Sequence, residues 1–90
     1  MQRLRGIQPV LRERYGVTML ALFGSFARSE QTERSDIDIL VALSEPDFRA
    51  FSAVAQLLSA LFPERRVEVV SKGAIRPEYM EAIQPDLAYA

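Results

Sequence analysis

The 90-residue sequence predicts a small α/β (α+β) domain in which helices pack against a mixed sheet of three to four strands. Short apolar runs bounded by glycine or polar residues predict the strands, and longer segments with apolar residues at helical spacing predict the helices. One helical segment joins the second and third apolar runs, as in the crossover connection between parallel strands. A chain of this length holds one core, so we expect a single domain over residues 1–90.

The first part of the chain predicts a helix followed by a buried strand. The helix is expected over residues 3–15, and Gly16 follows it where glycine commonly ends a helix. Pro9 predicts a kink or a later start of this helix. The apolar run from Val17 to Phe23 lies between two glycines, which favours a strand buried on both faces. The apolar positions of the helix are Leu4, Ile7, Val10, Leu11 and Tyr15.

A polar connection and an acidic strand are predicted next. Residues 25–28 are expected to form a helical turn, and residues 29–35 contain no apolar side chain, which predicts a surface loop. The second strand is expected over residues 36–43. One face of this strand carries Asp36, Asp38, Leu40 and Ala42, so that face is acidic where the strand begins and apolar further on.

A long amphipathic helix is predicted after this strand. It is expected to begin in the segment from Ser44 to Asp47, where either of these two residues can cap it, and Pro63 is expected to end it. Its apolar residues recur at helical spacing and predict a surface that packs in the core or against a partner. These residues are Phe48, Phe51, Val54, Ala55, Leu58, Leu61 and Phe62.

The last part of the chain predicts one more strand and one short helix. The third strand is expected over residues 66–71, with Glu68 on one of its faces. The helix is expected to begin at Pro77, because proline is favoured at the first helical position. Tyr79 and Tyr89 are expected to be packing residues rather than acceptors of a transferred group.

Composition excludes several classes of function. Eleven basic and twelve acidic residues give a formal net charge of −1, which provides no general field for binding DNA or RNA. Cysteine and histidine are absent, which excludes disulfides, zinc-type ligation, a cysteine nucleophile and a histidine base. No apolar stretch approaches the roughly 20 residues that span a bilayer, so we expect a soluble cytoplasmic protein. Carboxylate and hydroxyl chemistry remains.

Two short motifs combine the residue types that bind phosphate and metal ions. Gly24 and Ser25 follow the first strand, and a glycine beside a hydroxyl lets backbone N–H groups approach a phosphate closely. Asp36 and Asp38 lie two residues apart, so their carboxylates project to the same side of an extended segment. Hard divalent cations prefer such oxygen ligands. The pattern predicts a phosphate-and-metal site between two strands.

These motifs resemble the signature of the DNA polymerase β-type nucleotidyltransferase superfamily. The residues that carry the resemblance are Gly24-Ser25, then ten residues, then Asp36-Ile37-Asp38, within the longer segments 23–28 and 35–41. They are most similar to the minimal nucleotidyltransferases (MNT), whose length and initial helix match nearly the whole chain. The resemblance implies a fold like the palm of polymerase β, with helices packed against the mixed sheet.

The resemblance also implies an activity and a set of site residues. The activity is an Mg²⁺-dependent transfer of AMP from ATP to a hydroxyl group. Asp36 and Asp38, with Glu68 on the third strand, are the implied catalytic residues and the ligands of two Mg²⁺ ions. The implied nucleotide-binding residues are Gly24, Ser25 and Arg28.

A partner protein is implied as well. The MNT family suggests a HEPN-domain toxin with ribonuclease activity, on which the MNT protein modifies a tyrosine and so acts as a type VII-like antitoxin. We therefore expect a hetero-oligomer with that partner, with a homodimer as the alternative, and no direct binding of nucleic acid or membrane.

Two departures from the family pattern leave other functions open. Glu68 stands where relatives more often have aspartate, and its longer side chain could misplace the carboxylate. Ser29 stands where many relatives have glycine. The first alternative is a catalytically weak or inactive antitoxin that neutralises its partner by binding. The second is transfer to a small molecule of the aminoglycoside type, which the short chain disfavours.

Overall fold

A computed structural model describes residues 1–45 and 47–90. Within these residues the sheet has four strands in the spatial order β3-β2-β1-β4. Pro46, which falls in the predicted start of the long helix, lies outside the described residues. The elements in chain order are α1 (Gln2–Tyr15), β1 (Val17–Phe23), β2 (Ile37–Leu43), α2 (Phe48–Leu61), β3 (Val67–Ser71), the short 3-10 helix η1 (Lys72–Ala74), α3 (Pro77–Ile83), the short 3-10 helix η2 (Gln84–Asp86) and β4 (Ala88–Tyr89).

The sheet is mixed, as the sequence predicted. β1 and β2 are antiparallel and place Phe23 opposite Asp38. β2 and β3 are parallel, with Asp38 opposite Glu68, and α2 forms the predicted crossover between them. β4 pairs with the free edge of β1 in antiparallel orientation. The register brings three separate parts of the sequence together around Asp38.

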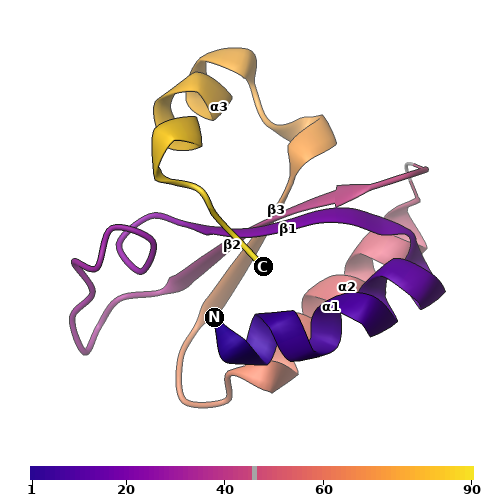
Figure 1. Cartoon of the computed structure of the whole chain (residues 1–90), viewed down its shortest axis with the longest axis horizontal. Coiled ribbons are helices and arrows are strands. Elements are labelled where there is room, and N and C mark those ends of the chain that lie inside the picture. Colours follow the sequence, from indigo (N-terminus) through magenta and orange to yellow (C-terminus); the bar gives the residue numbers. More distant parts are fainter. Residues whose placement is uncertain (46) are drawn as a thin grey trace.

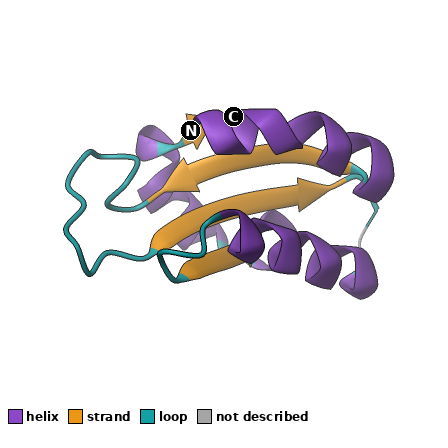
Figure 2. Ribbon diagram, turned by 90° about the horizontal axis from the view of Figure 1, so that it is seen from below, coloured by secondary structure: helices purple, strands orange, loops and turns teal. Residues whose placement is uncertain are grey.

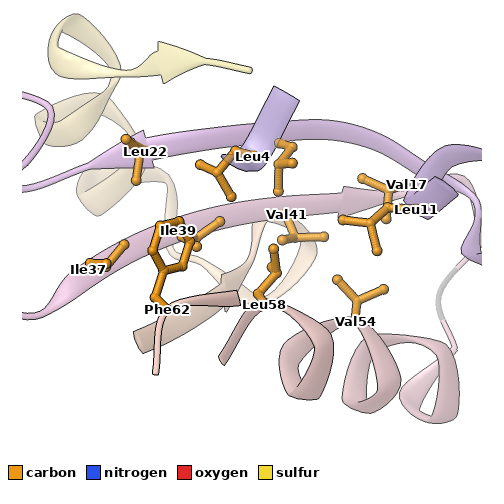
Figure 3. Packing of buried hydrophobic residues seen from close by; sticks show 11 residues of the cluster. Leu4, Leu11, Val17, Leu22, Ile37, Ile39, Val41, Val54, Leu58 and Phe62 are labelled. Carbon is orange, nitrogen blue, oxygen red and sulfur yellow. The ribbon is translucent and has the colours of Figure 1, made fainter. Parts of the chain in front are cut away.

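Both long helices lie on one face of the sheet, and α3 lies on the opposite side (Figures 1 and 2). Between α1, α2 and the sheet is a core of aliphatic side chains plus Phe62, several of them fully buried (Figure 3). The helices contribute Leu4, Leu11, Val54 and Leu58, the residue after α2 contributes Phe62, and the sheet contributes Val17, Leu20, Leu22, Ile37, Ile39 and Val41.

Side-chain alternation along β2 separates this core from the chemistry. Ile37, Ile39 and Val41 point toward the helices and are at most 4% exposed. Asp38 belongs to the other set of alternate residues and so points to the α3 side. The helix side therefore holds the main core, and the α3 side, where Leu40 is also fully buried, carries the acidic residue that begins a site.

The predicted helices and strands differ from the structure in some of their ends and in one missing strand. α1 begins at Gln2 and continues through Pro9, so the later start was wrong. β2 begins at Ile37, which leaves Asp36 just before the strand rather than inside it. β4 has two residues, too few to give a periodic signal, and no strand was predicted there. Among the described residues, no helix combines the length and apolar character needed to cross a bilayer.

Three aromatic residues are more exposed than predicted. Phe48 begins α2 and is 83% exposed, so it does not belong to the core stripe of that helix. Tyr79 is 51% exposed and Tyr89 is 54% exposed, so neither side chain is buried in the core. Helical spacing predicts which face of a helix is apolar. It does not predict whether a neighbouring element covers the first residue of that face, and Phe48 is left exposed.

Candidate active site

The turn that follows β1 packs directly against the acidic strand. Gly24 has a φ of 74°, in the left-handed region that favours glycine. A Cβ atom on Gly24 would collide with Oδ2 of Asp38. The left-handed backbone therefore favours glycine at this position, and a larger residue would also have to displace the Asp38 carboxylate. The two motifs recognised in the sequence meet here.

A compact turn follows Gly24. The N–H of Arg28 donates to the Gly24 carbonyl at 3.2 Å, and the N–H of Glu30 donates to the Ser25 carbonyl at 2.8 Å. Ser29 has a φ of 57°, a conformation that residues other than glycine adopt at a cost. Glycine would adopt this conformation without strain. The turn thus forms as predicted for residues 25–28, with a strained serine at its end.

Part of this turn offers unused hydrogen-bond donors. Within the described residues, the backbone N–H groups of Ser25, Phe26 and Ala27 donate no hydrogen bond. Successive free N–H groups in a turn form a concave site for anions. The Ser25 hydroxyl is half-buried beside them. This arrangement has the chemistry expected of a phosphate-binding turn.

Three carboxylates come from two neighbouring strands and the segment before them. Asp38 lies on β2 opposite Glu68 on β3, and register partners in parallel strands face the same side of the sheet. Asp36 precedes β2 by one residue, two positions before Asp38. The third carboxylate therefore comes from the predicted third strand, and the register places it opposite Asp38.

The electrostatics of the site disfavour ionised Asp38. Burial raises the pKa of the Asp38 carboxyl, and the negative charges of Glu68 and Asp36 raise it further. A side-chain hydrogen bond with Glu68 acts in the same direction, whereas the positive charge of Arg28 lowers this pKa. A bound cation would favour the ionised form of the cluster, as an opposite charge does for any carboxylate.

Arg28 provides the nearest positive charge on the turn. Its Nε lies 3.5 Å from Oε1 of Glu30, and its Nη1 lies 3.9 Å from Oδ2 of Asp86. The positive charge of the Arg28 guanidinium lowers the pKa of Asp38 in the acidic cluster. Arg28 also links the turn to η2, which the sequence did not predict.

The three carboxylates are suitable ligands for a hard cation, but they do not form a complete metal site by themselves in the described structure. Among the described residues, no group of three acidic side chains is close enough to bind a metal ion on its own. Carboxylates are nevertheless the ligands Mg²⁺ prefers, and Mg²⁺ is usually bound by one or two of them together with substrate phosphates and water. Asp36, Asp38 and Glu68 therefore fit Mg²⁺ that arrives with a nucleotide.

A cavity of about 470 Å³ lies on the other side of the turn. Its lining includes the core residues Leu22, Ile37 and Phe62, so it opens on the helix side of the sheet. Phe26 and Arg65 also line it. None of the three carboxylates is among its lining residues, so the cavity is separate from the acidic cluster.

Sequence reasoning missed Arg65, which lies between α2 and β3. Its guanidinium contacts the polar loop and the Phe26 ring. Periodicity and motif spacing carry no signal for such a contact, because it joins one side chain to the backbone of a distant loop. The adjacent arginines at positions 65 and 66, just before a strand, were the only feature that marked the place.

A glycine turn against a pair of strand carboxylates is the arrangement of a nucleotidyl-transfer site, and the comparison with known families agrees. The chain belongs to the nucleotidyltransferase domain family, which matches residues 4–85. It is therefore an enzyme of the nucleotidyltransferase class, and its substrate is a nucleotide. The family predicted from the two motifs is confirmed.

Similar proteins are named protein adenylyltransferases, a smaller group within that family. The chain is 47% identical over 88 residues to a protein of Methanocaldococcus jannaschii that is named provisionally as a protein adenylyltransferase, a match that covers 96% of this chain and 89% of that protein. It is 36% identical over 80 residues to the protein adenylyltransferase MntA of Thermococcus cleftensis, covering 88% and 80% of the two chains. This chain thus groups with protein adenylyltransferases.

Solved structures share the fold. A structure named provisionally as a minimal nucleotidyltransferase is 28% identical with a TM-score of 0.77, and the match covers 97% of this chain and 92% of that one. A toxin-antitoxin structure with AMP-PNP is 22% identical with a TM-score of 0.75, covering 99% and 72%. A structure of a tri-AMPylated Shewanella oneidensis HEPN toxin in complex with an MNT antitoxin is 22% identical with a TM-score of 0.64. This match covers 99% of this chain and 71% of that one. The predicted mixed-sheet, minimal nucleotidyltransferase fold is confirmed.

Proposed function

We propose that this nucleotidyltransferase is an antitoxin that transfers AMP from ATP to a tyrosine hydroxyl of a partner HEPN-domain toxin. The observation that carries the proposal is the contact between the Gly24 turn and Asp38, with Glu68 beside it in the register. A protein acceptor is supported by the relatives that are named protein adenylyltransferases. A HEPN partner and a tyrosine acceptor come from the family resemblance, and the complexes that share this fold are consistent with such a partner.

The turn and the carboxylates have separate tasks in the proposed reaction. The acceptor hydroxyl attacks the α-phosphorus of ATP, a P–O bond to AMP forms, and pyrophosphate leaves. The free N–H groups at Ser25, Phe26 and Ala27 would hold the β- and γ-phosphates, with the Ser25 hydroxyl and Arg28 beside them. Holding ATP in this way aligns the α-phosphate with the acidic cluster.

The three carboxylates would hold Mg²⁺ at the α-phosphate. Asp36 and Asp38 are its proposed first ligands, and Glu68 is a further ligand or the base that accepts the proton of the attacking hydroxyl. Mg²⁺ supplies neutralisation of the charge that develops on the phosphate oxygens. Ionised Asp38 is disfavoured in the free protein, so nucleotide with Mg²⁺ should bind more tightly as the pH rises through the Asp38 pKa.

The direct test is a transfer assay with the neighbouring-gene HEPN protein, Mg²⁺ and α-labelled ATP. The wild-type chain should label the HEPN protein, and replacement of the acceptor tyrosine should remove the label. The double variant Asp36→Ala with Asp38→Ala should label at least about 100-fold less, because the aligned metal ligands are gone. Glu13→Ala, an exposed carboxylate on α1 away from the site, is the matched control. Equal labelling by the double variant contradicts the proposal.

A second candidate is a binding antitoxin with little or no transfer activity. Glu68 favours it, because glutamate is longer by one methylene than the aspartate more common at this position, and the three carboxylates do not form a metal site in the free protein. In that case ATP with Mg²⁺ would raise the unfolding temperature, and the HEPN partner would be neutralised without labelling. Robust transfer excludes this candidate, and Glu68→Asp should then increase the rate.

Transfer to a small molecule of the aminoglycoside type remains a third candidate. A screen of free small acceptors with labelled ATP tests it, since labelling without any partner protein would favour it.

A further inference from the structure

Arg65 joins two ends of the loop that carries the site motifs. Its Nη1 donates to the carbonyl oxygens of Thr32 at 2.9 Å, Ser35 at 3.1 Å and Glu33 at 3.4 Å. On the other side, the guanidinium carbon lies 4.9 Å from the centre of the Phe26 ring. The side chain is half-buried and lines the cavity on the helix side of the sheet.

The contacts of Arg65 flank the two motifs directly. Phe26 follows Ser25 of the phosphate-binding turn, and Ser35 precedes Asp36 of the acidic cluster. The loop between them is otherwise exposed, and its own hydrogen bonds are short-range, such as Thr32 N–H to the Ser35 hydroxyl at 2.8 Å. Arg28 of the loop also pairs with Asp86, but among the described residues Arg65 is the outside side chain that contacts both ends of the loop.

We propose that Arg65 is a positioning residue that holds the phosphate-binding turn and Asp36 at the separation needed for nucleotidyl transfer. This inference rests on the proposed transfer activity and assigns a role to a residue outside the sequence motifs. Among the described residues Arg65 makes no ion pair with a carboxylate, and it acts through the backbone of residues 32–35 and the ring of Phe26.

The chemistry of the guanidinium fits this role better than that of an ammonium group. A planar guanidinium donates hydrogen bonds in its plane and stacks on an aromatic face at the same time. Lysine offers a compact charge on a flexible stem and does not reproduce both contacts in one geometry. The backbone carbonyls accept hydrogen bonds at fixed places, so losing the guanidinium frees the loop without removing any residue of the site.

Arg66 supplies a matched control. It is the same residue type one position later, its side chain is exposed, and among the described residues that side chain makes no hydrogen bond or ion pair. Only its backbone carbonyl has a partner here, the N–H of Ile37 at 2.9 Å, and this contact is kept in any side-chain variant. Arg65→Ala and Arg66→Ala therefore change charge equally and differ in the loop contacts.

The kinetic test compares both variants in the transfer assay. Arg65→Ala should lower kcat by about 10- to 100-fold with little change in the KM for ATP, because misplacement of the reacting groups costs rate more than binding. Arg65→Lys should fall between Arg65→Ala and wild type. Guanidinium ion at millimolar concentration should restore part of the kcat of Arg65→Ala. Arg66→Ala should match wild type and should not respond to guanidinium.

A second measurement does not depend on transfer. Arg28 and Arg34 are exposed trypsin sites in the loop, and Arg65→Ala should accelerate native-state cleavage at both, whereas Arg66→Ala should not. Arg65→Lys is used in its place if Arg65→Ala does not fold. If wild type transfers nothing, the proposed function fails, and unchanged cleavage then also overturns the role of Arg65. With active wild type, equal kcat in the two alanine variants, or a loss that guanidinium does not restore, overturns it.

Discussion

The two faces of the sheet have opposite properties although they share the same strands. On the helix side, β2 places Ile37, Ile39 and Val41 in a core where most side chains are fully buried. On the α3 side, the same strand places Asp38 beside Glu68, and burial and like charge act against its ionised form. Period-two alternation on one strand thus places the main core on one face and the acidic residues on the other, where Leu40 of the same strand is also fully buried. Truncating a core residue on the helix side and removing the charge of Asp38 should therefore change stability in opposite directions.

The largest loss of stability is expected on the helix side. Leu58→Ala removes a fully buried side chain of α2 and leaves a cavity, so the free energy of unfolding should fall by about 3 kcal/mol. Equilibrium denaturation with urea measures it. Val10→Ala on the exposed part of α1 is the control and should cost much less. Equal losses in the two variants would show that the core is not where this structure places it.

A smaller loss is expected where the two motifs meet. Gly24→Ala forces a left-handed backbone onto alanine and pushes a Cβ into the Asp38 carboxylate, so the free energy of unfolding should fall by about 2 kcal/mol. Transfer activity should be lost even where the variant is folded. Gly6→Ala is the control, because an added Cβ there meets no atom within 4 Å. A tolerated Gly24→Ala would contradict the left-handed strain expected at this turn.

On the α3 side, removal of a charge should stabilise the free protein. The Asp38 pKa is raised above its usual value of 3.8, so below that value the carboxyl is protonated in both folded and unfolded states. As the pH rises through the folded-state pKa, the folded protein binds more protons than the unfolded one, and the free energy of unfolding falls.

Asp38→Asn removes this dependence. It should be more stable than wild type at neutral pH without metal, and the difference should disappear below about pH 4. Urea denaturation across this pH range measures it. Asp47→Asn is the control, because Asp47 lies outside the acidic cluster. Its carboxylate caps α2 by accepting a hydrogen bond from the N–H of Arg49 at 2.9 Å. A difference between wild type and Asp38→Asn that grows toward low pH is the contrary result.

The smallest effect is expected at the end of the phosphate-binding turn. Ser29→Gly relieves the left-handed strain at φ 57°, offset by the greater freedom of glycine in the unfolded chain, so it should gain about 0.5 kcal/mol or less. Ser59→Gly, on the exposed side of α2, should instead lose about 0.5–1 kcal/mol. Serine-to-glycine substitution should thus raise the free energy of unfolding at position 29 and lower it at position 59. A lower free energy of unfolding for Ser29→Gly would indicate that contacts of the serine side chain stabilise the turn.

Local patterns predicted much of this molecule from the sequence. The glycines at 16 and 24 bound β1 as expected, and the helical segment between β2 and β3 gave the parallel crossover. The place of Glu68 beside Asp38 followed from the third strand. These features depend on periodicity and on residue types at fixed spacing, which are properties of the chain itself.

Other features depend on contacts between distant segments. The loop contacts of Arg65 join positions about 30 residues apart, and the pairing of β4 with β1 closes over most of the chain. The exposure of Phe48 depends on which neighbours reach the first turn of α2. No local pattern records such contacts, so they appear only in the folded structure.

We propose that the α3 side is a nucleotide and metal site whose negative charges are not fully neutralised in the free protein. The most direct test is the unfolding temperature of wild type and Asp38→Asn, each without ligand and with Mg²⁺ and ATP. Without ligand, Asp38→Asn should unfold at the higher temperature, and Mg²⁺ with ATP should raise the wild-type value more than that of the variant. A lower unfolding temperature for ligand-free Asp38→Asn, with equal increases on adding Mg²⁺ and ATP, would contradict the account.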